Sequence, residues 1–479
     1  MLVKEDPSTI QSYLEDSSNT PGGHADKIII PENIDEASAA FKKAYADKTP
    51  VTVSGAGTGQ AGGRIPFGGI VISTEKLTKI KKIEKIGEKG YAIVEAGVLI
   101  KDLKASCERK RLFYTYDPTE QTAFAGGTIA TNASGARSFR YGSTRKYVLE
   151  LTLILADGEV FHLKRGDVKA KAGTIKFKTG KKDYEIRLPT YKMPPTKNSA
   201  GYYAKDDMDL IDLFIGQEGT LGTIAEAKLG LIKMPKEFLT MFVFFKNEEK
   251  ALKFTRDARK ARPAAIEYFD KNTLALLSEK YPNVPKDREA AIFFEDEIST
   301  TEDKAVEKWE KIFSRGGISL DDTQVAMSEK TRREFMEKRQ FIPERMSEMA
   351  KHSGFPKVST DLAVPENKNE EMLRHYRETL KLAPFLYFIF GHIGDSHMHV
   401  NMLPGSKKEY DVARRMQLDF VKKSVSLGGT VSAEHGIGKA KKDFLKLLYG
   451  EKGIREMIRV KCALDAKLIL GRGNIFDFF

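Results

Sequence analysis

The chain has little cysteine, a single tryptophan and no long apolar run. Its two cysteines, Cys107 and Cys462, lie far apart, which argues against a disulfide framework and favours a reducing, cytoplasmic setting. No apolar stretch approaches the roughly 18–20 residues that cross a bilayer. Residues 1–20 also lack the apolar segment and the cleavage signature of a secretory signal. Neither a transmembrane protein nor a disulfide-rich secreted protein is therefore expected.

Positive charge is in surplus, because 79 lysines and arginines against 67 acidic residues give a formal net charge of +12. That balance permits nucleic-acid binding, but the lysines are spread widely and no stacked-aromatic RNA motif is present. The lysine-dense residues 164–182 and 439–446 fit a solvated surface or, alternatively, docking on an anionic membrane or an acidic electron carrier. We expect no nucleic-acid partner, and peripheral contact with the inner face of the membrane stays open.

A chain of 479 residues, 41% of them hydrophobic, exceeds one ordinary core and predicts two or three domains. We predict the α+β class, with a first domain over residues 1–235, a second over 236–452 and a C-terminal segment, 453–479, that returns to the first. In the first region short strands alternate with helices. In the second region we expect a sheet with helices on one face.

Apolar periodicity and turn residues set the expected boundaries. In the first region we predict strands at 27–31, 50–54, 68–74 and 91–98, helices at 34–47 and 99–111, and a hairpin at 151–163 turning at Asp157-Gly158. In the second we predict strands at 238–247, 264–270 and 290–297, and helices at 247–261, 301–315 and 331–352. A final helix is predicted at about 453–464.

Histidine is scarce but clustered. Three of the eight histidines lie between residues 392 and 399, in FGHIGDSHMHVN, and a fourth, His435, follows Glu434 in SAEHGIG. Two imidazoles and one carboxylate, here His392, His399 and Glu434, form a common ligand set for a divalent metal. A further histidine beside that set is a natural proton acceptor.

The pattern around these histidines predicts a hairpin. The aromatic run 385–390 is typical of a buried strand, and the residues after Gly394 have turn chemistry. A hairpin folded about the bond between Asp395 and Ser396 sets His392 opposite His399, with Cβ atoms roughly 4.5–5.5 Å apart. The alternative is a polar turn whose histidines bond to the backbone.

Three loops are rich in glycine and other small residues. Residues 57–62 match GxGxxG, but Pro66 and another strand follow where a dinucleotide-binding fold of the Rossmann type needs a helix, so we reject such an NAD site. The same loop can instead present backbone N–H groups to an anion, the alternative being a flexible turn. With the loops at 117–142 and 216–222, it predicts an extended ligand wrapped by backbone, such as an adenine dinucleotide.

These motifs also carry a family resemblance. PVTVSGAGTGQAGG, GGTIATNASG and LFIGQEGTLGTI resemble the flavin-binding domain of the vanillyl-alcohol oxidase/p-cresol methylhydroxylase (PCMH) superfamily. FGHIGDSHMHVNM and GGTVSAEHGIGK resemble its branch of FAD-linked D-2-hydroxyacid dehydrogenases. The resemblance implies a PCMH-type FAD-binding domain of two α/β subdomains and a substrate (cap) domain with an antiparallel sheet covered by helices. Because the glycine loops contain neither histidine nor cysteine, FAD should be bound non-covalently.

The resemblance assigns roles to individual residues. For the cofactor it implies contacts from Ser54, Gly55, Ala56, Gly57, Thr58 and Gly59 to the pyrophosphate, and from Pro118, Gly126, Gly127, Thr128, Asn132, Tyr141, Gly142, Glu218, Gly219 and Ile224 elsewhere on FAD. For the reaction it implies His392, His399 and Glu434 as ligands of zinc or manganese, His435 as catalytic base, Asn401 as substrate contact and Arg339 as a carboxylate clamp.

The chain departs from the family pattern in several places. Ser396 and His397 stand where the family usually has glycine and asparagine, so His397 is either an extra ligand or alters the metal preference. The C-terminal LDAKLILGRGNIF replaces the usual asparagine-proline-glycine close, which puts the flavin contacts there in doubt. Met336 replaces a tryptophan often found three residues before the substrate arginine, and Arg339 is alternatively a solvent-exposed helix residue.

The activity implied is oxidation of a D-2-hydroxy acid, of the D-lactate, glycolate or D-2-hydroxyglutarate class, to the 2-oxo acid. The electron acceptor is left open among quinone, cytochrome, electron-transfer flavoprotein and oxygen, and so is a homodimer. One alternative is a transferase resembling alkyldihydroxyacetone-phosphate synthase, which the single His435 and the polar GDSHMH turn disfavour. The other is a non-catalytic flavin-binding subunit.

Overall fold

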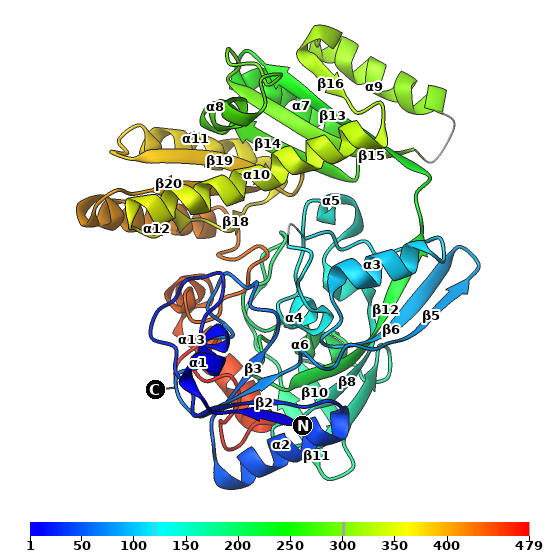
Figure 1. The fold of residues 1–479 in the computed structure, drawn as a ribbon, viewed down its shortest axis with the longest axis vertical. Coiled ribbons are helices and arrows are strands. Elements are labelled where there is room, and N and C mark those ends of the chain that lie inside the picture. The colour runs from blue at the N-terminus through cyan, green and yellow to red at the C-terminus, as the bar shows by residue number, and fades with distance from the viewer. Residues whose placement is uncertain (119, 299–301, 479) are drawn as a thin grey trace.

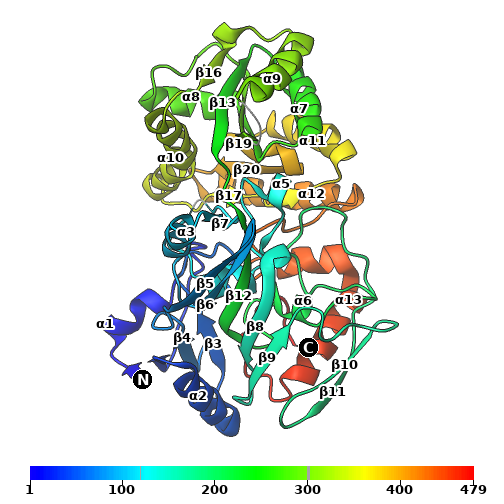
Figure 2. The same ribbon diagram turned by 90° about the vertical axis from the view of Figure 1, so that its right-hand side faces the viewer.

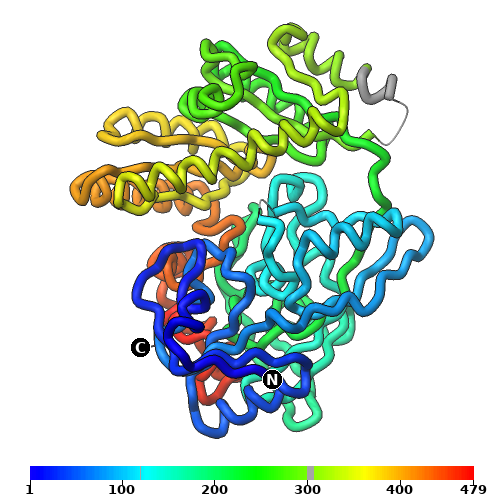
Figure 3. Tube along the Cα trace, in the orientation of Figure 1, coloured from blue at the N-terminus to red at the C-terminus, as the bar shows by residue number. Residues whose placement is uncertain are grey.

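The computed structural model describes residues 1–118, 120–298 and 302–478. Two bodies stack along its long axis, and both termini lie in the lower one (Figure 1). The chain rises once into the upper body, residues 237–426, and descends again to a C-terminal helix in the lower body (Figure 3). This path brings the last residues of the sequence back beside the first strands.

The first sheet of the lower body has four short apolar strands in the order β1-β2-β4-β3. Their bounds are β1 Leu2–Lys4, β2 Lys27–Ile30, β3 Val51–Ser54 and β4 Ile70–Ser73. β2, β4 and β3 run parallel, and helix α2 (Ile34–Asp47) packs on them through Ala37 and Phe41. Asn33 caps this helix by accepting a hydrogen bond from the N–H of Glu36. Residues 55–69 contain no helix, as the sequence indicated.

The second sheet is antiparallel, in the order β5-β6-β12-β8-β9, with β7 paired to β12. Its strands are β5 Ile80–Ile86, β6 Lys89–Glu95, β7 Leu112–Phe113, β8 Val148–Ile154, β9 Val160–Lys164 and β12 Thr223–Lys233. The predicted hairpin is present, and Gly158 in its turn has φ +81. Around the sheet lie α3 (Ile100–Glu108), α4 (Ala125–Ala130), α5 (Ser138–Tyr141), α6 (Ile211–Phe214) and the separate hairpin β10 (Thr174–Lys178)–β11 (Asp183–Arg187).

The upper body is built on an eight-stranded antiparallel sheet, in the order β16-β13-β15-β14-β19-β20-β17, with β18 paired to β20. Its strands are β13 Glu237–Phe245, β14 Ala265–Asp270, β15 Ala290–Ile298, β16 Thr323–Val325, β17 Val358–Ser359, β18 Leu362–Ala363, β19 Leu386–His392 and β20 His397–Leu403. The helices are α7 Glu248–Ala261, α8 Lys271–Lys280, α9 Glu302–Gly316, α10 Glu329–Ser353, α11 Asn369–Leu380 and α12 Lys407–Ser426. The predicted start of α9, residue 301, lies outside the described residues.

Helices cover both faces of this sheet, so the expectation of one covered face was wrong. Helices α8 and α10 pack against Phe242 and Phe244, whereas α7, α9, α11 and α12 pack on the side of Met241 and Val243 (Figure 2). The reason is that the strands are apolar at consecutive positions, and alternate side chains of a strand point to opposite faces. Each face therefore has its own apolar core.

The C-terminal helix α13 (Lys442–Leu464) is longer than the predicted 453–464 and is interrupted at Gly450, where φ is 67. After it the chain runs beside the first sheet, where Val51 donates its N–H to Ile469 O at 2.8 Å and Gly471 donates to Val51 O. The last residues thus extend the edge at β3. Within the described ranges, no helix is both long and apolar enough to cross a membrane.

Candidate active site

The clustered histidines lie on the hairpin β19–β20, but its register differs from the prediction. His392 pairs with His397 rather than with His399. The turn is a 3-10 turn at Ile393–Asp395 followed by Ser396 at φ 53, so residues 393–396 form the loop and the pairing shifts by two residues. His392 and His399 still share a face as diagonal neighbours, with ring centroids 5.7 Å apart.

Gly391 permits the close approach of these side chains. Its φ is +136, a backbone conformation that other residues rarely adopt, and an added Cβ would lie 3.0 Å from Cδ2 of His399 and 3.1 Å from the carbonyl oxygen of His397. A side chain at this position would therefore displace the imidazole. The glycine is part of what packs the histidine rings together.

Glu434 closes the cluster from a different part of the chain. Its Oε1 lies 3.0 Å from Nε2 of His392, 3.4 Å from Nε2 of His399 and 3.7 Å from Nδ1 of His397. One ligand atom from each of these four residues lies within 4.8 Å of the others. The three predicted ligands thus come together, and His397 joins them as a fourth candidate because it sits directly opposite His392.

The outer nitrogens of two imidazoles are held by second partners. Nδ1 of His392 is hydrogen-bonded to Glu267 Oε1 at 2.6 Å, and Nδ1 of His399 to the carbonyl oxygen of Thr360 at 3.0 Å. This leaves Nε2 of both rings facing Glu434, the arrangement in which a carboxylate or carbonyl orients a metal-binding histidine. His397 is fully buried; its Nε2 lies 3.1 Å from Asp361 Oδ1, whereas its Nδ1 makes no hydrogen bond within the described structure. The donor set and this unpaired Nδ1, 3.7 Å from Glu434 Oε1, fit a divalent cation such as zinc.

Asp361 fixes the segment that carries Glu434 and His435. Its carboxylate accepts the backbone N–H of Glu434 at 3.2 Å and of His435 at 3.0 Å, and pairs with Lys441 at 2.7 Å. Nδ1 of His435 lies 3.4 Å from Asp361 Oδ2, which leaves Nε2 as the free nitrogen of that ring. The ring of His435 stacks on that of His399 at 5.6 Å, so the fourth histidine lies against the cluster.

Burial and neighbouring charges perturb the titration of these groups. Burial lowers the pKa of His392, but the carboxylates of Glu267 and Glu434 outweigh it and raise the pKa to about 9. Burial lowers the pKa of His397 to about 3 and that of His435 to about 4, Asp361 opposing it in the second case. Shifts of this size in one cluster are typical of functional sites.

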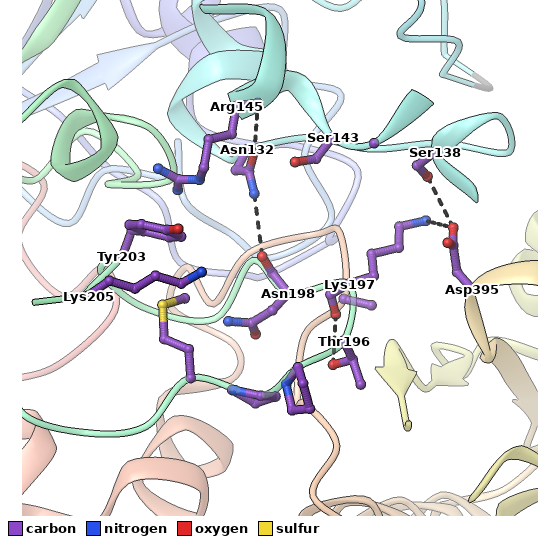
Figure 4. Close-up of a pocket in the computed structure, with 15 residues that line it drawn as sticks. Asn132, Ser138, Ser143, Arg145, Thr196, Lys197, Asn198, Tyr203, Lys205 and Asp395 are labelled. Carbon is purple, nitrogen blue, oxygen red and sulfur yellow. Dashed lines mark hydrogen bonds and ion pairs between the residues drawn. The ribbon is translucent and has the colours of Figure 1, made fainter. Parts of the chain in front are cut away.

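Lys197 lines a cavity of about 430 Å³, together with Asn132, Arg145, Asn198 and Lys205 (Figure 4). Its ammonium is 3.0 Å from Glu434 Oε2 and 3.6 Å from Asp395 Oδ2. Burial would raise the pKa of Glu434, but Lys197 and His392 hold it well below its usual value. The two oxygens of Glu434 therefore have different partners, imidazoles on one side and Lys197 on the other.

Arg339 and Asn401, predicted as a carboxylate clamp and a substrate contact, lie on the same side of the sheet. Nη2 of Arg339 is 3.6 Å from Glu267 Oε2, and the guanidinium lies over the ring of Phe293. Asn401 accepts a hydrogen bond from Ser359 at 2.7 Å, and its buried Nδ2 has no partner within the described structure. A guanidinium and a free amide donor thus flank the histidine cluster.

Four residues of this site were missed by sequence reasoning: Lys197, Glu267, Thr360 and Asp361. Glu267 carried a signal, because an acidic residue inside the apolar strand AAIEYFD is expensive to bury without a partner. Thr360 acts through its backbone carbonyl, which sequence does not reveal. Lys197 and Asp361 come from irregular segments whose position only the folded chain defines.

The loop after β3 has the features of an anion site. None of the N–H groups of residues 55–59 donates a hydrogen bond to another described residue. Such half-buried, unpaired donors suit a pyrophosphate, which accepts several hydrogen bonds at once. The six predicted residues, Ser54 to Gly59, form the end of β3 and this loop.

Several other predicted cofactor residues border open space or connect loops. A Cβ added at Gly127 would meet nothing within 4 Å, and Gly142 and Gly219 have φ of 84 and 74. The Glu218 carboxylate accepts the N–H of Ile437 at 2.8 Å and of Gly438 at 2.6 Å. It thereby ties the third glycine loop to the segment after His435. The carbonyl of Pro118 accepts a hydrogen bond from a glutamine side chain.

The remaining predicted cofactor residues make contacts within the protein. Gly126 packs on Ala96, Thr128 donates to the carbonyl of residue 125, and Asn132 accepts the N–H of residue 145. The hydroxyl of Tyr141 bonds to Glu297 in the upper body, and Ile224 lies in the main core. These side chains hold the loops in shape, and their contact with FAD stays a prediction.

The altered C-terminal motif keeps one buried link to the glycine loops. The Asn474 side chain donates to the carbonyls of Gly63 at 2.7 Å and Glu218 at 3.0 Å, and accepts from Lys439. The asparagine therefore joins the first and third glycine loops although the residues around it differ from the family pattern.

Comparison with known proteins agrees with this architecture. The family described as FAD linked oxidases, C-terminal domain, matches residues 234–475, just over half of the chain, and the FAD binding domain matches residues 25–164. A solved alkyldihydroxyacetonephosphate synthase superposes with a TM-score of 0.69 over 98% of this chain and 82% of its own, at 14% identity, which shows a shared fold.

Among curated relatives, a D-lactate dehydrogenase of Archaeoglobus fulgidus is 31% identical over 94% of this chain and 90% of its own. A D-lactate dehydrogenase of Anaerostipes hadrus is 30% identical and the glycolate oxidase subunit GlcD of Bacillus subtilis 29%, each over 94% of this chain and 89% of its own. Both bodies of the structure are covered by these matches. The chain is an FAD-linked oxidoreductase and belongs to the family of FAD-linked oxidases.

Proposed function

We propose that this protein oxidises a D-2-hydroxy acid to the 2-oxo acid, with FAD and a divalent metal, zinc or manganese. The observation that carries the proposal is the convergence of three imidazoles on Glu434 Oε1, with His435 stacked against them. Relatives named for D-lactate, glycolate and D-2-hydroxyglutarate support the substrate class.

Each side chain of the cluster has a separate task. His435 takes the hydroxyl proton at Nε2, because Asp361 faces its Nδ1 and a neutral imidazole has one nitrogen able to accept a proton. His392, His399, Glu434 and, as a fourth ligand, His397 would hold the metal, which would supply a Lewis acid for the hydroxyl and the carboxylate of the acid. FAD, when bound, would accept the α-hydrogen with its two electrons as a hydride.

Recognition of the acid falls to the groups around the cluster. The Arg339 guanidinium can form paired hydrogen bonds to a carboxylate. It now lies 3.6 Å from the Glu267 carboxylate, and the carboxylate of the substrate would take over part of this contact. The Asn401 Nδ2 supplies a further donor, since it has no partner among the described residues. Glu267 has a second role, because it also orients His392.

The decisive experiment is anaerobic mixing of the FAD-loaded protein with a panel of D- and L-2-hydroxy acids, with metal analysis of the same sample. We expect rapid bleaching of the flavin by one or more D-acids and about one metal ion per chain. No bleaching by any acid would overturn the oxidation. Formation of a flavin adduct without two-electron reduction would favour the synthase-like transferase, with which the chain shares its fold.

The electron acceptor follows from the same preparation. Once a substrate is found, reoxidation by oxygen, a quinone analogue, a cytochrome and an electron-transfer flavoprotein can be compared. The acceptor that reoxidises the flavin fastest indicates the acceptor class. Co-sedimentation with vesicles tests peripheral membrane contact.

A further inference from the structure

In the loop after β3, the backbone N–H groups and the backbone carbonyls have different surroundings. Within the described structure, the N–H groups of residues 55–59 have no partner, whereas the carbonyls of Gly55 and Gly57 both accept hydrogen bonds. The Gly55 carbonyl accepts from Nη1 of Arg64 at 2.8 Å. The Gly57 carbonyl accepts from the N–H of Ser17 at 3.1 Å.

This pattern has a direct geometric consequence. In a trans peptide group the C=O and the N–H of the next residue point in opposite directions within one plane. Holding the Gly55 carbonyl toward Arg64 therefore points the Ala56 N–H away from Arg64. Holding the Gly57 carbonyl toward Ser17 does the same for the N–H of Thr58. Two donors of the loop are thus aimed at the side where a pyrophosphate would bind.

The guanidinium of Arg64 is held in place by several contacts. Nη2 donates to the carbonyl of Ser12, and the guanidinium lies 5.9 Å from the ring centroid of Tyr13. An added Cβ at Gly57 would lie 2.5 Å from Nη1, so the loop passes directly over the guanidinium at a residue with φ +83. Arg64 thus bridges the glycine loop and the N-terminal segment.

That segment is itself anchored. Ile10 and Tyr13 are buried in a small core with β2 and β4, and the Tyr13 hydroxyl donates to Glu75 at 2.8 Å. Residues 12–17 precede the part of the chain that matches the FAD binding domain, residues 25–164. They support the loop on the side toward which the carbonyls of Gly55 and Gly57 point. Burial lowers the pKa of the Arg64 guanidinium, and the nearby carboxylates of Asp16 and Glu75 oppose that effect.

We propose that Arg64 and the backbone N–H of Ser17 are positioning residues for the FAD pyrophosphate, acting through the carbonyls of Gly55 and Gly57. The N-terminal segment then belongs to the cofactor site through these two carbonyls. This inference rests on the FAD dependence of the proposed function but not on the substrate or the metal.

The test compares two flavins, of which FAD carries the pyrophosphate and its adenosine and riboflavin carries neither. FAD and riboflavin are titrated into flavin-free protein, with affinity measured by quenching of flavin fluorescence, for R64A, R64K, S17P and the control R455A. Proline at position 17 removes the N–H donor and also the hydroxyl, which lies 3.4 Å from the Gly57 carbonyl. Arg455 is an exposed arginine elsewhere on the surface. We expect R64A and S17P to weaken FAD binding at least about tenfold, the loss of one charge-assisted or structural hydrogen bond.

Riboflavin affinity should change less than about twofold in the same variants, because it has no phosphate for the loop to bind. R64K should recover most of the FAD affinity, since an ammonium can still donate to the Gly55 carbonyl. Unchanged FAD binding in R64A and S17P overturns the proposal, and so does an equal loss for both flavins, which indicates general loosening. Flavin reduction by hydroxy acids is measured separately in the wild-type protein. Failure of the proposed reaction can therefore be distinguished from failure of the proposed role of Arg64 and Ser17.

Discussion

His435, which we propose as the proton acceptor, has its Nδ1 facing Asp361 and its ring stacked on that of His399. We predict that H435N slows anaerobic flavin reduction by the best substrate about 10²–10⁴-fold, the usual contribution of a general base, while FAD and metal contents stay at wild-type values. Stopped-flow absorbance measures the rate. H352N, at an exposed histidine of α10, is the matched control. A normal reduction rate in H435N would remove the proton-accepting role.

The role of Glu267 can be tested separately from that of the proposed metal ligands. Glu267 is hydrogen-bonded to His392 but is not itself one of those ligands. E267Q keeps the shape but removes the charge that orients the imidazole. We expect metal affinity to fall about 10–100-fold, as is typical for loss of such an outer partner. Competition with a chelator measures it, and E279Q, an exposed surface substitution, should have no effect. Equal metal affinity in both variants would contradict the orienting role.

At the residue scale, the sequence predicted that His392, His399 and Glu434 come together, because candidate metal ligands are drawn from few residue types. Their roles stay predictions. Sequence reasoning placed His392 opposite the wrong histidine, since the loop length of a hairpin depends on one backbone conformation, the positive φ of Ser396. It missed Asp361, which no local pattern distinguishes from a surface carboxylate. Burial and convergence of distant segments are properties of the folded chain alone.

Among the elements, the hairpin β19–β20 depends on one buried side chain of α7. Arg259, 7% exposed, donates from Nη2 to the carbonyl of Ile393 and to Ser396 Oγ, the latter at 2.8 Å. These bonds hold the turn that carries His392 and His397. The same turn holds Ser396, a non-glycine residue, in the left-handed region, a conformation that costs about 1 kcal/mol or more.

We predict that R259M loosens this turn, because two hydrogen bonds to a charged donor are lost, each worth about 1.5–3 kcal/mol. Amide hydrogen exchange of residues 393–398 should accelerate at least about tenfold, and bound metal should decrease. R256M is the control, since Arg256 lies on the same helix but pairs with Glu370 at the surface. Identical exchange in both variants would show that Arg259 does not hold the turn.

The elements themselves were predictable where periodicity was strong. Helix α2 was placed at its observed bounds, 34–47, because its apolar positions and its Asn33 cap are local signals. The part of α13 before residue 453 was missed. Glycine at position 450 is typical of the end of a helix, and the turn before α13 is rich in charge. Short strands such as β17 and β18 have too few residues for any periodicity and are defined by their pairing with β20.

Across the whole molecule, buried charges join the two bodies. Arg137, from the segment that precedes α5, forms a paired contact with Glu295 of β15 at 2.9 and 3.1 Å and lies 3.3 Å from Asp117. The guanidinium also stacks over Phe238 at the start of the upper sheet. Such a pair is strongly destabilising when only one partner is removed, because the other charge stays buried. It therefore links the second glycine loop to the sheet of the upper body.

R137M should accordingly lower the free energy of unfolding by about 3–5 kcal/mol, because Glu295, 1% exposed, loses the only cation with which it pairs among the described residues. The double variant R137M/E295M should recover a large part of that loss, since no charge is then left unpaired. R140M, at a neighbouring arginine that is 30% exposed, should cost about 1 kcal/mol or less. Urea unfolding of the FAD-loaded protein measures these three variants and the single variant E295M. If the effects of R137M and E295M simply add, the two residues are not coupled. The contact between the bodies then depends on apolar packing, and the orientation of the upper body toward the flavin loops should survive loss of the pair.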